Sequence, residues 1–189
     1  MKINTPSPSL WSRIREHWRR QWASHLGTLA LMLVVFFGVQ AWQTRGVAVG
    51  PLPDLAFTLI DRDGSQQTTT LAAWRERHAG KPVALYLWAE WCPICKLQQP
   101  NVTDLAADVP LLTIAMQSGP PPTVARVLAQ RQLPWPTAVD PRGELSRALG
   151  FASVPAFVVV DADGQLRLPT VGYTSGLGMR VRLWWAGIF

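Results

Sequence analysis

The sequence predicts an α/β sandwich with a central mixed sheet, preceded by one transmembrane helix. Two observations favour the sandwich: short apolar and β-branched runs alternate with helical patterns, and a last hairpin and helix close the chain. A third observation, the uncharged apolar run from Leu26 to Trp42, favours the membrane helix. The 189 residues suit one domain plus an appendage, and an apolar fraction of 48% is enough to fill a core.

The excess positive charge of the chain is confined to its N-terminal segment. The formal net charge is +6, and residues 1–45 hold six basic side chains and one acid, whereas the rest of the chain holds twelve and eleven. A charge excess that stops before the folded domain does not mark a binding face for phosphates. We therefore expect no nucleic-acid partner.

The N-terminal segment predicts a basic leader over residues 1–21 and a transmembrane anchor over residues 22–43. The run is long enough to cross a hydrocarbon core, which takes roughly 17–25 helical residues, and tryptophans stand at both of its ends. Four arginines precede the run and only Arg45 lies close after it. The positive-inside rule then keeps the leader in the cytoplasm and exports the chain from about Thr44 onward.

Two other structures could produce the same run. A buried helix of a soluble domain would not begin amid arginines, and it would have a polar face. A cleaved signal peptide is the stronger rival, because Val39-Gln-Ala41 resembles a cleavage site. The leader is long, however, and the run exceeds the usual signal-peptide core of about 7–15 residues. We expect a retained anchor, and a mature N-terminus at Trp42 would contradict it.

Residues 44–53 are predicted to be a short linker, and residues 54–189 form the expected exported domain. The domain begins with a hairpin, in which apolar and polar residues alternate around a glycine turn at 61–64. A short helix follows over 71–80 and ends in a glycine. The apolar, aromatic run at 83–89 is typical of a strand covered on both faces.

The alternation continues to the end of the chain. The next expected elements are a helix over 92–108, a buried strand over 111–116 and a helix containing Val124, Val127 and Leu128. They are followed by a strand at 137–139, a helix at 143–149 and a hairpin of strands at 156–160 and 165–173. A terminal helix carries an apolar stripe that we expect to pack on the core: Leu177, Val181, Trp184 and Ile188. The alternative is that Trp184 and Trp185 contact a membrane or a partner.

The only two cysteines, Cys92 and Cys95, are separated by Pro93 and Ile94. A structural disulfide across two residues would constrain the unfolded chain very little. A metal site needs four nitrogen or sulfur ligands, or three plus water, and two of the three histidines lie in or beside the membrane segment. We expect no metal site, although a Cu(I) site completed by other ligands stays open as an alternative.

A dithiol that is oxidised and reduced has a direct physical basis here. A strand ending at Ala89 and a helix beginning near Cys92 put the first sulfur at a helix N-terminus, where unpaired amides and the macrodipole stabilise a thiolate. Pro93 suits the first helical turn, because its missing N–H removes no intrahelical bond. Cys92 would then be the attacking sulfur, and Cys95, one turn deeper, would resolve the mixed disulfide.

Two segments carry a family resemblance. WAEWCPICK resembles the active-site segment of the thioredoxin family, and GFASVPAFVVVDADG is similar to its cis-proline loop and following strand. The resemblance covers about residues 54–189 and implies a thioredoxin-like three-layer sandwich with an N-terminal hairpin extension. The extension and the anchor resemble the TlpA-like periplasmic thiol:disulfide oxidoreductases. Among these, the CPIC, SVPAFVVVD and GYTSGLGMRVRLWWA segments look most like the group associated with suppression of copper sensitivity.

The resemblance implies roles for individual residues. Cys92 and Cys95 would be the catalytic redox pair, with their disulfide and no other cofactor. Pro155 would be a cis-proline that presents the backbone of Val154 to an extended substrate, and Trp91 and Pro93 would also face the substrate.

The sequence departs from the family at two positions. Tyr86 stands where thioredoxins usually keep an aspartate, and Gln98 stands where many cytochrome-maturation reductases have a glutamate. The substitutions weaken a role in cytochrome c maturation and leave the proton acceptor for Cys95 unnamed.

The function implied by the resemblance is thiol:disulfide exchange on exported proteins at a bacterial inner membrane. The domain would lie in the periplasm, reduce or exchange disulfides and receive electrons from a DsbD-type membrane donor. Two alternatives stay open: a disulfide oxidase or isomerase, because Pro93-Ile94 is not the Gly-Pro pair of thioredoxin, and a copper-binding or copper-delivery module that uses the same two thiols.

Overall fold

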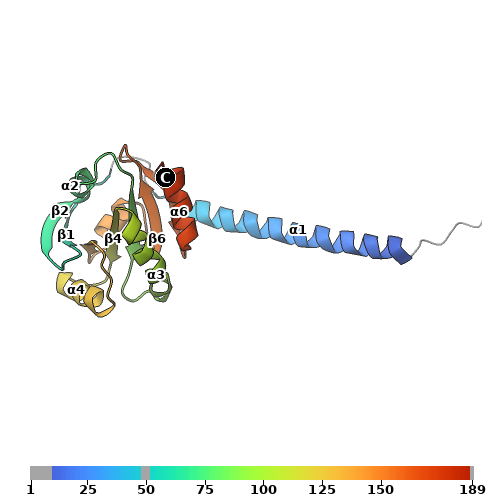
Figure 1. Ribbon diagram of the computed structural model, residues 1–189, viewed down its shortest axis with the longest axis horizontal. Helices are drawn as coiled ribbons and strands as arrows, with labels where there is room; N and C mark the ends of the chain where they lie inside the picture. Colours follow the sequence, from blue (N-terminus) through green and yellow to red (C-terminus); the bar gives the residue numbers. More distant parts are fainter. Residues whose placement is uncertain (1–9, 48–51, 188–189) are drawn as a thin grey trace, which may run out of the picture. The chain divides into compact units, whose positions relative to one another are not determined.

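The computed structural model describes residues 10–47 and 52–187 (Figure 1). The chain divides into two units, Met1–Trp42 and Gln43–Phe189. In the first unit the structure describes the helix α1 (Leu10–Gln43), whose last residue already belongs to the second. Its stretch from Ser24 to Gln43 has a mean hydropathy of 1.7, and none of it is buried. Twenty helical residues span about 30 Å, the thickness of a hydrocarbon core. By length and composition this helix can cross a membrane or serve as a signal sequence.

The second unit is built on one seven-stranded mixed sheet with the strand order β2-β1-β5-β4-β3-β6-β7 (Figure 1). The strands are β1 (Ala56–Ile60), β2 (Gln66–Thr70), β3 (Val83–Trp88), β4 (Leu111–Met116), β5 (Thr137–Asp140), β6 (Ala156–Val160) and β7 (Leu166–Val171). β3, β4 and β5 are parallel, while β1, β2, β6 and β7 join by antiparallel pairing. The helices are α2 (Leu71–Glu76), α3 (Pro93–Asp108), α4 (Pro121–Gln130), α5 (Glu144–Ala148) and α6 (Gly176–Trp185).

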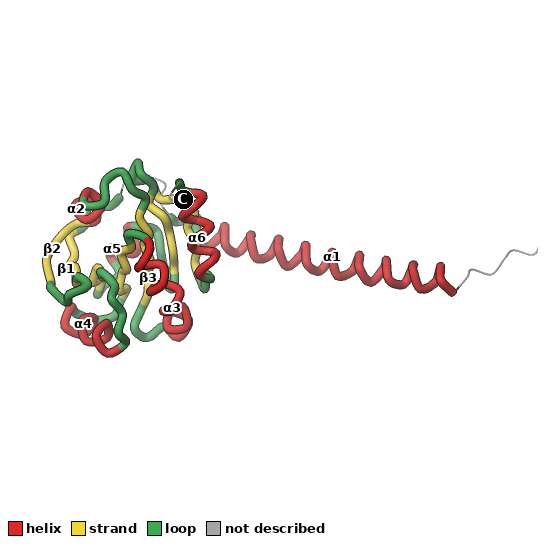
Figure 2. Tube along the Cα trace, viewed as in Figure 1, coloured by secondary structure: helices red, strands yellow, loops and turns green. Residues whose placement is uncertain are grey.

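Helices lie around the sheet (Figure 2), and its two faces bury two separate cores. Alternation along β3 divides its side chains, so that Tyr86 and Trp88 join one core and Leu85 and Leu87 the other. Helices α3, α4 and α6 supply the first core, and α2 and α5 the second. This arrangement confirms the predicted three-layer sandwich with a central mixed sheet, and β1 and β2 form the expected N-terminal hairpin.

Val47, which falls within the predicted linker, is buried in the second core with 8% of its surface exposed. The chain beside it passes Gly150, where φ is +85°. A Cβ atom on Gly150 would overlap the backbone of Gly46 and Val47, so only glycine allows this approach. The segment at 46–47 is therefore packed on the domain.

The helix predicted over 71–80 is shorter in the structure. Thr70 caps its start by accepting a hydrogen bond from the Ala73 amide, and α2 ends at Glu76. The Arg75 guanidinium then donates to the carbonyls of His78, Asp161 and Ala162, which holds the following residues in turns. Long-range bonds of this kind leave no local sequence signal.

The predicted packing of α6 is wrong. Met179 and Leu183 are the side chains it buries, while the stripe of Leu177, Val181 and Trp184 is exposed; Ile188 lies outside the described residues. The helix is apolar on two faces, so periodicity cannot choose between them. In the structure α6 packs beside α3, where Arg180 forms an ion pair with Asp108 at 2.5 Å and Gly176 lies near Asn101.

Candidate active site

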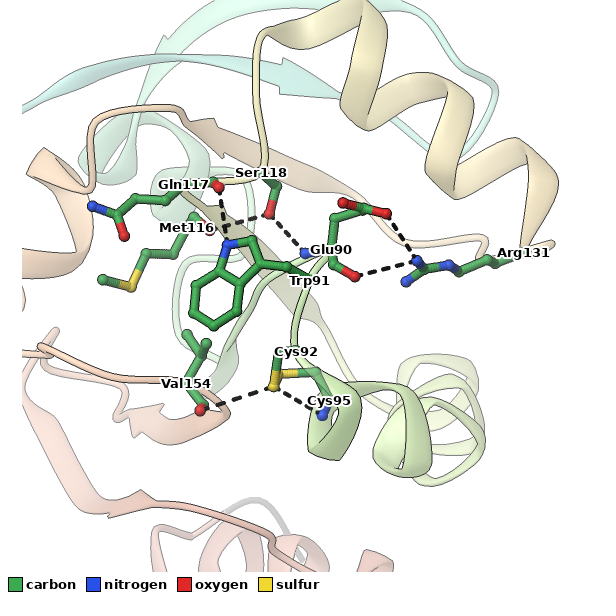
Figure 3. The surroundings of a disulfide bond; sticks show 9 residues. All are labelled: Glu90, Trp91, Cys92, Cys95, Met116, Gln117, Ser118, Arg131 and Val154. Atoms are coloured by element: carbon green, nitrogen blue, oxygen red, sulfur yellow. Dashed lines mark hydrogen bonds and ion pairs between the residues drawn. A yellow bond between two sulfur atoms is a disulfide. The ribbon is translucent and has the colours of Figure 1, made fainter.

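The two cysteines lie at the N-terminus of α3, just beyond the end of β3, and form a disulfide (Figure 3). Cys92 is the N-cap, with extended backbone, and its Sγ accepts a hydrogen bond from the Cys95 amide at 3.1 Å. Pro93 occupies the first helical turn, as its fixed φ favours. Because a cap residue faces the unpaired amides of the first turn, the Cys92 sulfur sits at the positive end of the helix dipole.

The loop before β6 meets the disulfide from the other side. Antiparallel pairing of Ala156 with Leu87 brings the start of β6 to the end of β3 where the cysteines lie. The peptide bond between Val154 and Pro155 is cis, and the Val154 carbonyl oxygen lies 3.9 Å from the Cys92 sulfur. Val154 is half-buried and Pro155 is buried.

Apolar side chains form an exposed rim beside the disulfide. Trp91 is 57% exposed, and its indole N–H donates to the Gln117 carbonyl at 3.1 Å, which fixes the ring (Figure 3). Pro93, Ile94 and Leu97 are also exposed on the first turns of α3. Sequence reasoning named Trp91 and Pro93 but missed Ile94 and Leu97. For Leu97 a signal was available, because a residue two positions after Cys95 lies on the opposite side of α3 from that buried side chain. Ile94 carries no such signal, because it stands four residues before the buried Gln98.

The acidic residue next to the motif is directed away from the sulfurs. The backbone N–H of Glu90 donates to Ser118, and Arg131 donates to both the Glu90 carbonyl and its carboxylate (Figure 3). The ion pair with Arg131 measures 3.4 Å. Glu90 thus anchors the turn before Cys92 to the loop after β4 and to Arg131.

Uncharged polar groups lie beneath Cys95. On α3, Cys95 and Gln98 face the sheet one turn apart, and on β3 the side chains that face this core are Trp88 and Tyr86. Both amide atoms of Gln98, the Tyr86 hydroxyl and the Trp88 indole N–H are buried and have no hydrogen-bond partner among the described residues. Burial raises the pKa of Tyr86 well above its ordinary value, so the phenol stays neutral.

The one buried carboxylate among the described residues is engaged elsewhere. Asp140 accepts hydrogen bonds from the amides of Leu145 and Ser146 and from the Ser146 hydroxyl, and so caps α5. Among the described residues, no other buried carboxylate could accept the proton of Cys95.

A metal site finds little support in the described residues. They contain no group of three or more His, Cys, Asp and Glu side chains that could hold an ion. His78 contacts Trp74 and borders a hollow lined by Ala106, Ala107 and Asp108 at the C-terminal end of α3. A 16-residue helix is about 24 Å long, so His78 and Cys92 lie at opposite ends of it.

Comparison with known proteins agrees with this geometry. A family model described as Redoxin matches residues 49–176. A thioredoxin-like protein of Haemophilus influenzae is 32% identical over 110 residues, which are 58% of this chain and 65% of that protein. A thiol:disulfide interchange protein DsbE homolog of Paracoccus denitrificans is 29% identical over 80 residues, 42% of this chain and 44% of that protein. The chain spans less than two thirds of the length of these relatives.

Solved structures share the fold. The dsbF protein of MTB superimposes with a TM-score of 0.58 at 23% identity, over 74% of this chain and 99% of that one. StoA from Bacillus subtilis gives a TM-score of 0.54 at 18% identity, over 71% and 98%. At these identities the likeness establishes the thioredoxin-like fold alone.

Proposed function

The chain belongs to the Redoxin family, and from that membership we propose that it is a thiol:disulfide oxidoreductase working through Cys92 and Cys95. The observation that carries the proposal is the position of the Cys92 sulfur. It accepts the Cys95 amide at 3.1 Å and lies 3.9 Å from the Val154 carbonyl beside cis-Pro155. The names of the relatives, a DsbE homolog and a ResA oxidoreductase, support the same activity.

The mechanism follows from the two environments of the sulfurs. In the reduced protein, the Cys95 amide and the helix dipole would stabilise a Cys92 thiolate. This thiolate attacks one sulfur of a substrate disulfide, and the other substrate sulfur leaves as a thiolate. Cys92 and the attacked sulfur are then joined in a mixed disulfide. Cys95 then loses its proton and attacks the Cys92 sulfur, releasing the second substrate thiol. The substrate disulfide is reduced, and the Cys92–Cys95 pair is oxidised.

Substrate binding is assigned to the rim and the cis-proline loop. An extended segment of an exported protein would lie along the Val154 backbone and contact Trp91 and Pro93, and also Ile94 and Leu97. An apolar rim with main-chain acceptors suits unfolded or partly folded polypeptides, because its contacts do not depend on particular substrate side chains.

Location at a bacterial inner membrane completes the proposal. Helix α1 would be retained as a single-pass anchor with residues 1–21 cytoplasmic and residues 54–189 periplasmic, supported by the apolar stretch at 24–43 and the arginines before it. A DsbD-type membrane protein would supply electrons. The closest functional group would be the copper-sensitivity suppressors, on the CPIC, SVPAFVVVD and C-terminal segments.

Thiol exchange by the full chain in detergent tests the proposal. Insulin reduction should be robust and lost in Cys92→Ser, with His78→Ala as a matched control that keeps both sulfurs. Equilibration with glutathione then sets the direction: a potential near −270 mV fits a reductase, and one near −120 mV fits the oxidase alternative. Inactivity of the wild-type chain with tight Cu(I) binding would replace the proposal with a copper carrier.

A further inference from the structure

Helix α6 presents a second apolar face to the outside of the domain. Leu177 is 74% exposed, Trp184 57% and Trp185 73%, and Val181 is about half exposed. Spacings of three and four residues place these side chains along one side of the helix, while Met179 and Leu183 fill the core on the other. A helix surface that faces water is normally polar, so an apolar face of this size indicates an interaction surface.

The neighbouring edge strand extends the same surface. Leu168 and Pro169 form a bulge in β7, where Leu168 has a φ of +51° and an exposed side chain. A hollow of about 570 Å³ connects them to α6, lined by Leu168, Pro169 and Trp185 with Asp161, Leu166, Arg167 and Ala186. The apolar surface thus crosses from the helix to the sheet.

The chemistry of the surface matches a lipid–water interface. Two tryptophans stand side by side, with ring centroids 6.3 Å apart. Arg180 and Arg182 lie on the same helix, which contains no acidic residue. Tryptophan and arginine both join an apolar body to a polar end, and they concentrate where a helix lies in the plane of a membrane.

Chain length keeps the domain beside such an interface. The apolar stretch of α1 ends at Gln43, and Val47 is already packed in the core of the second unit. Four residue steps separate them, and these reach at most about 14 Å when fully extended. With α1 retained in the membrane, this short connection keeps the domain within reach of the lipid headgroups.

Docking through α6 would leave the disulfide free. The contacts of α6 with α3 run in the same order along both helices, from Gly176 on Asn101 to Arg180 on Asp108. Trp184 and Trp185 therefore lie beyond the last turn of α3, whereas Cys92 caps its first turn. The rim around Trp91 stays accessible to a substrate.

We propose that the α6 face, defined as Leu177, Val181, Trp184 and Trp185 with Leu168 of β7, docks on the surface of the phospholipid bilayer that holds α1. The occupant is the bilayer itself, and the proposal rests on the retained anchor of the proposed function. Docking would fix the orientation of the domain and leave Cys92, at the other end of α3, outside the docked surface.

The test uses the full chain labelled with 5-fluorotryptophan, at one chain per nanodisc of phosphatidylglycerol and phosphatidylcholine. Fluorine resonances are assigned with Trp184→Phe, Trp185→Phe and Trp91→Phe. Trp91 is a matched control, because it and Trp184 are both 57% exposed. Headgroup-level nitroxide lipids should broaden the Trp184 and Trp185 resonances several-fold more than that of Trp91, and a water-soluble gadolinium chelate should do the reverse.

Equal broadening of Trp91 and Trp184 by the lipids would overturn docking. Protection of Trp184 from the chelate without broadening by the lipids would also overturn it and indicate a protein partner. The double variant Val181→Asp, Trp184→Asp should lose the broadening of Trp185 by the nitroxide lipids, because acidic side chains are repelled by the anionic headgroups, while insulin reduction stays unchanged. Since exchange is measured on the same samples with Cys92→Ser, a failure of docking is distinguished from a failure of the proposed activity.

Discussion

The backbone amide of Cys95 donates a hydrogen bond to the sulfur of Cys92 at 3.1 Å, within the first turn of α3. The donor belongs to the main chain, so it is present with any residue except proline at position 95. The Cys95 side chain can therefore be replaced without removing the amide that stabilises the Cys92 thiolate.

The first prediction concerns thiolate formation at Cys92. Its pKa is expected below the usual value of about 8.5, because the amide and the helix dipole favour the charged sulfur. The Cys95→Ser variant should keep this low pKa, since it keeps the amide. The rate of iodoacetamide alkylation against pH measures it. A titration like that of free cysteine in both proteins would contradict the assignment.

The second prediction uses the unpartnered amide of Gln98. Gln98→Leu should leave the free energy of unfolding unchanged or raise it, because a buried amide without partners is removed. Gln98→Glu places a carboxyl whose folded pKa is raised by burial, so the protein is most stable below the unfolded pKa and loses stability as pH rises. Urea unfolding should show that the free energy of unfolding of the Glu variant falls by roughly 2–4 kcal/mol from pH 5 to pH 8, and that the wild type and the Leu variant show no such fall.

A third prediction follows from the raised pKa of Tyr86. Burial disfavours the phenolate in the folded state, so the stability contribution of the neutral phenol is full below the unfolded pKa near 10 and falls at higher pH. Tyr86→Phe should remove this alkaline loss while keeping the packing of the ring on Trp135. Comparing urea midpoints at pH 9 and pH 11 tests it, and an identical loss in both proteins would show that other groups cause it.

Two glycines with similar backbones offer a fourth prediction. Gly150 and Gly164 have φ of +85° and +80°, but a Cβ would overlap the Gly46–Val47 backbone at the first and meet nothing within 4 Å at the second. Gly164→Ala should lower the free energy of unfolding only by the strain of a left-handed alanine, about 1–2 kcal/mol. Gly150→Ala should lower the free energy of unfolding clearly more and increase amide hydrogen exchange at Val47. Equal urea midpoints for the two variants would refute the packed segment.

The alternation of apolar runs predicted the sheet and both hairpins, because burial on one or two faces dictates those patterns directly. Pro93 and the strand before it likewise located Cys92 at a helix start. The packing of α6 could not be predicted, since the helix has two apolar faces and the burial of Met179 and Leu183 depends on how it packs beside the distant helix α3. The pairing of Glu90 with Arg131 and the burial of Val47 depend on similar long-range contacts, which leave no periodic signal.

The bulge of Leu168 and Pro169 has a consequence for self-association. β7 is an outer strand of the sheet, and a proline there withholds the amide that an added strand would need, while the bulge bends the edge. The opposite outer strand, β2, is short and polar, with the sequence QQTTT. Neither outer strand is a good template for another chain, so strand addition at the edges of the sheet should not drive self-association of the domain.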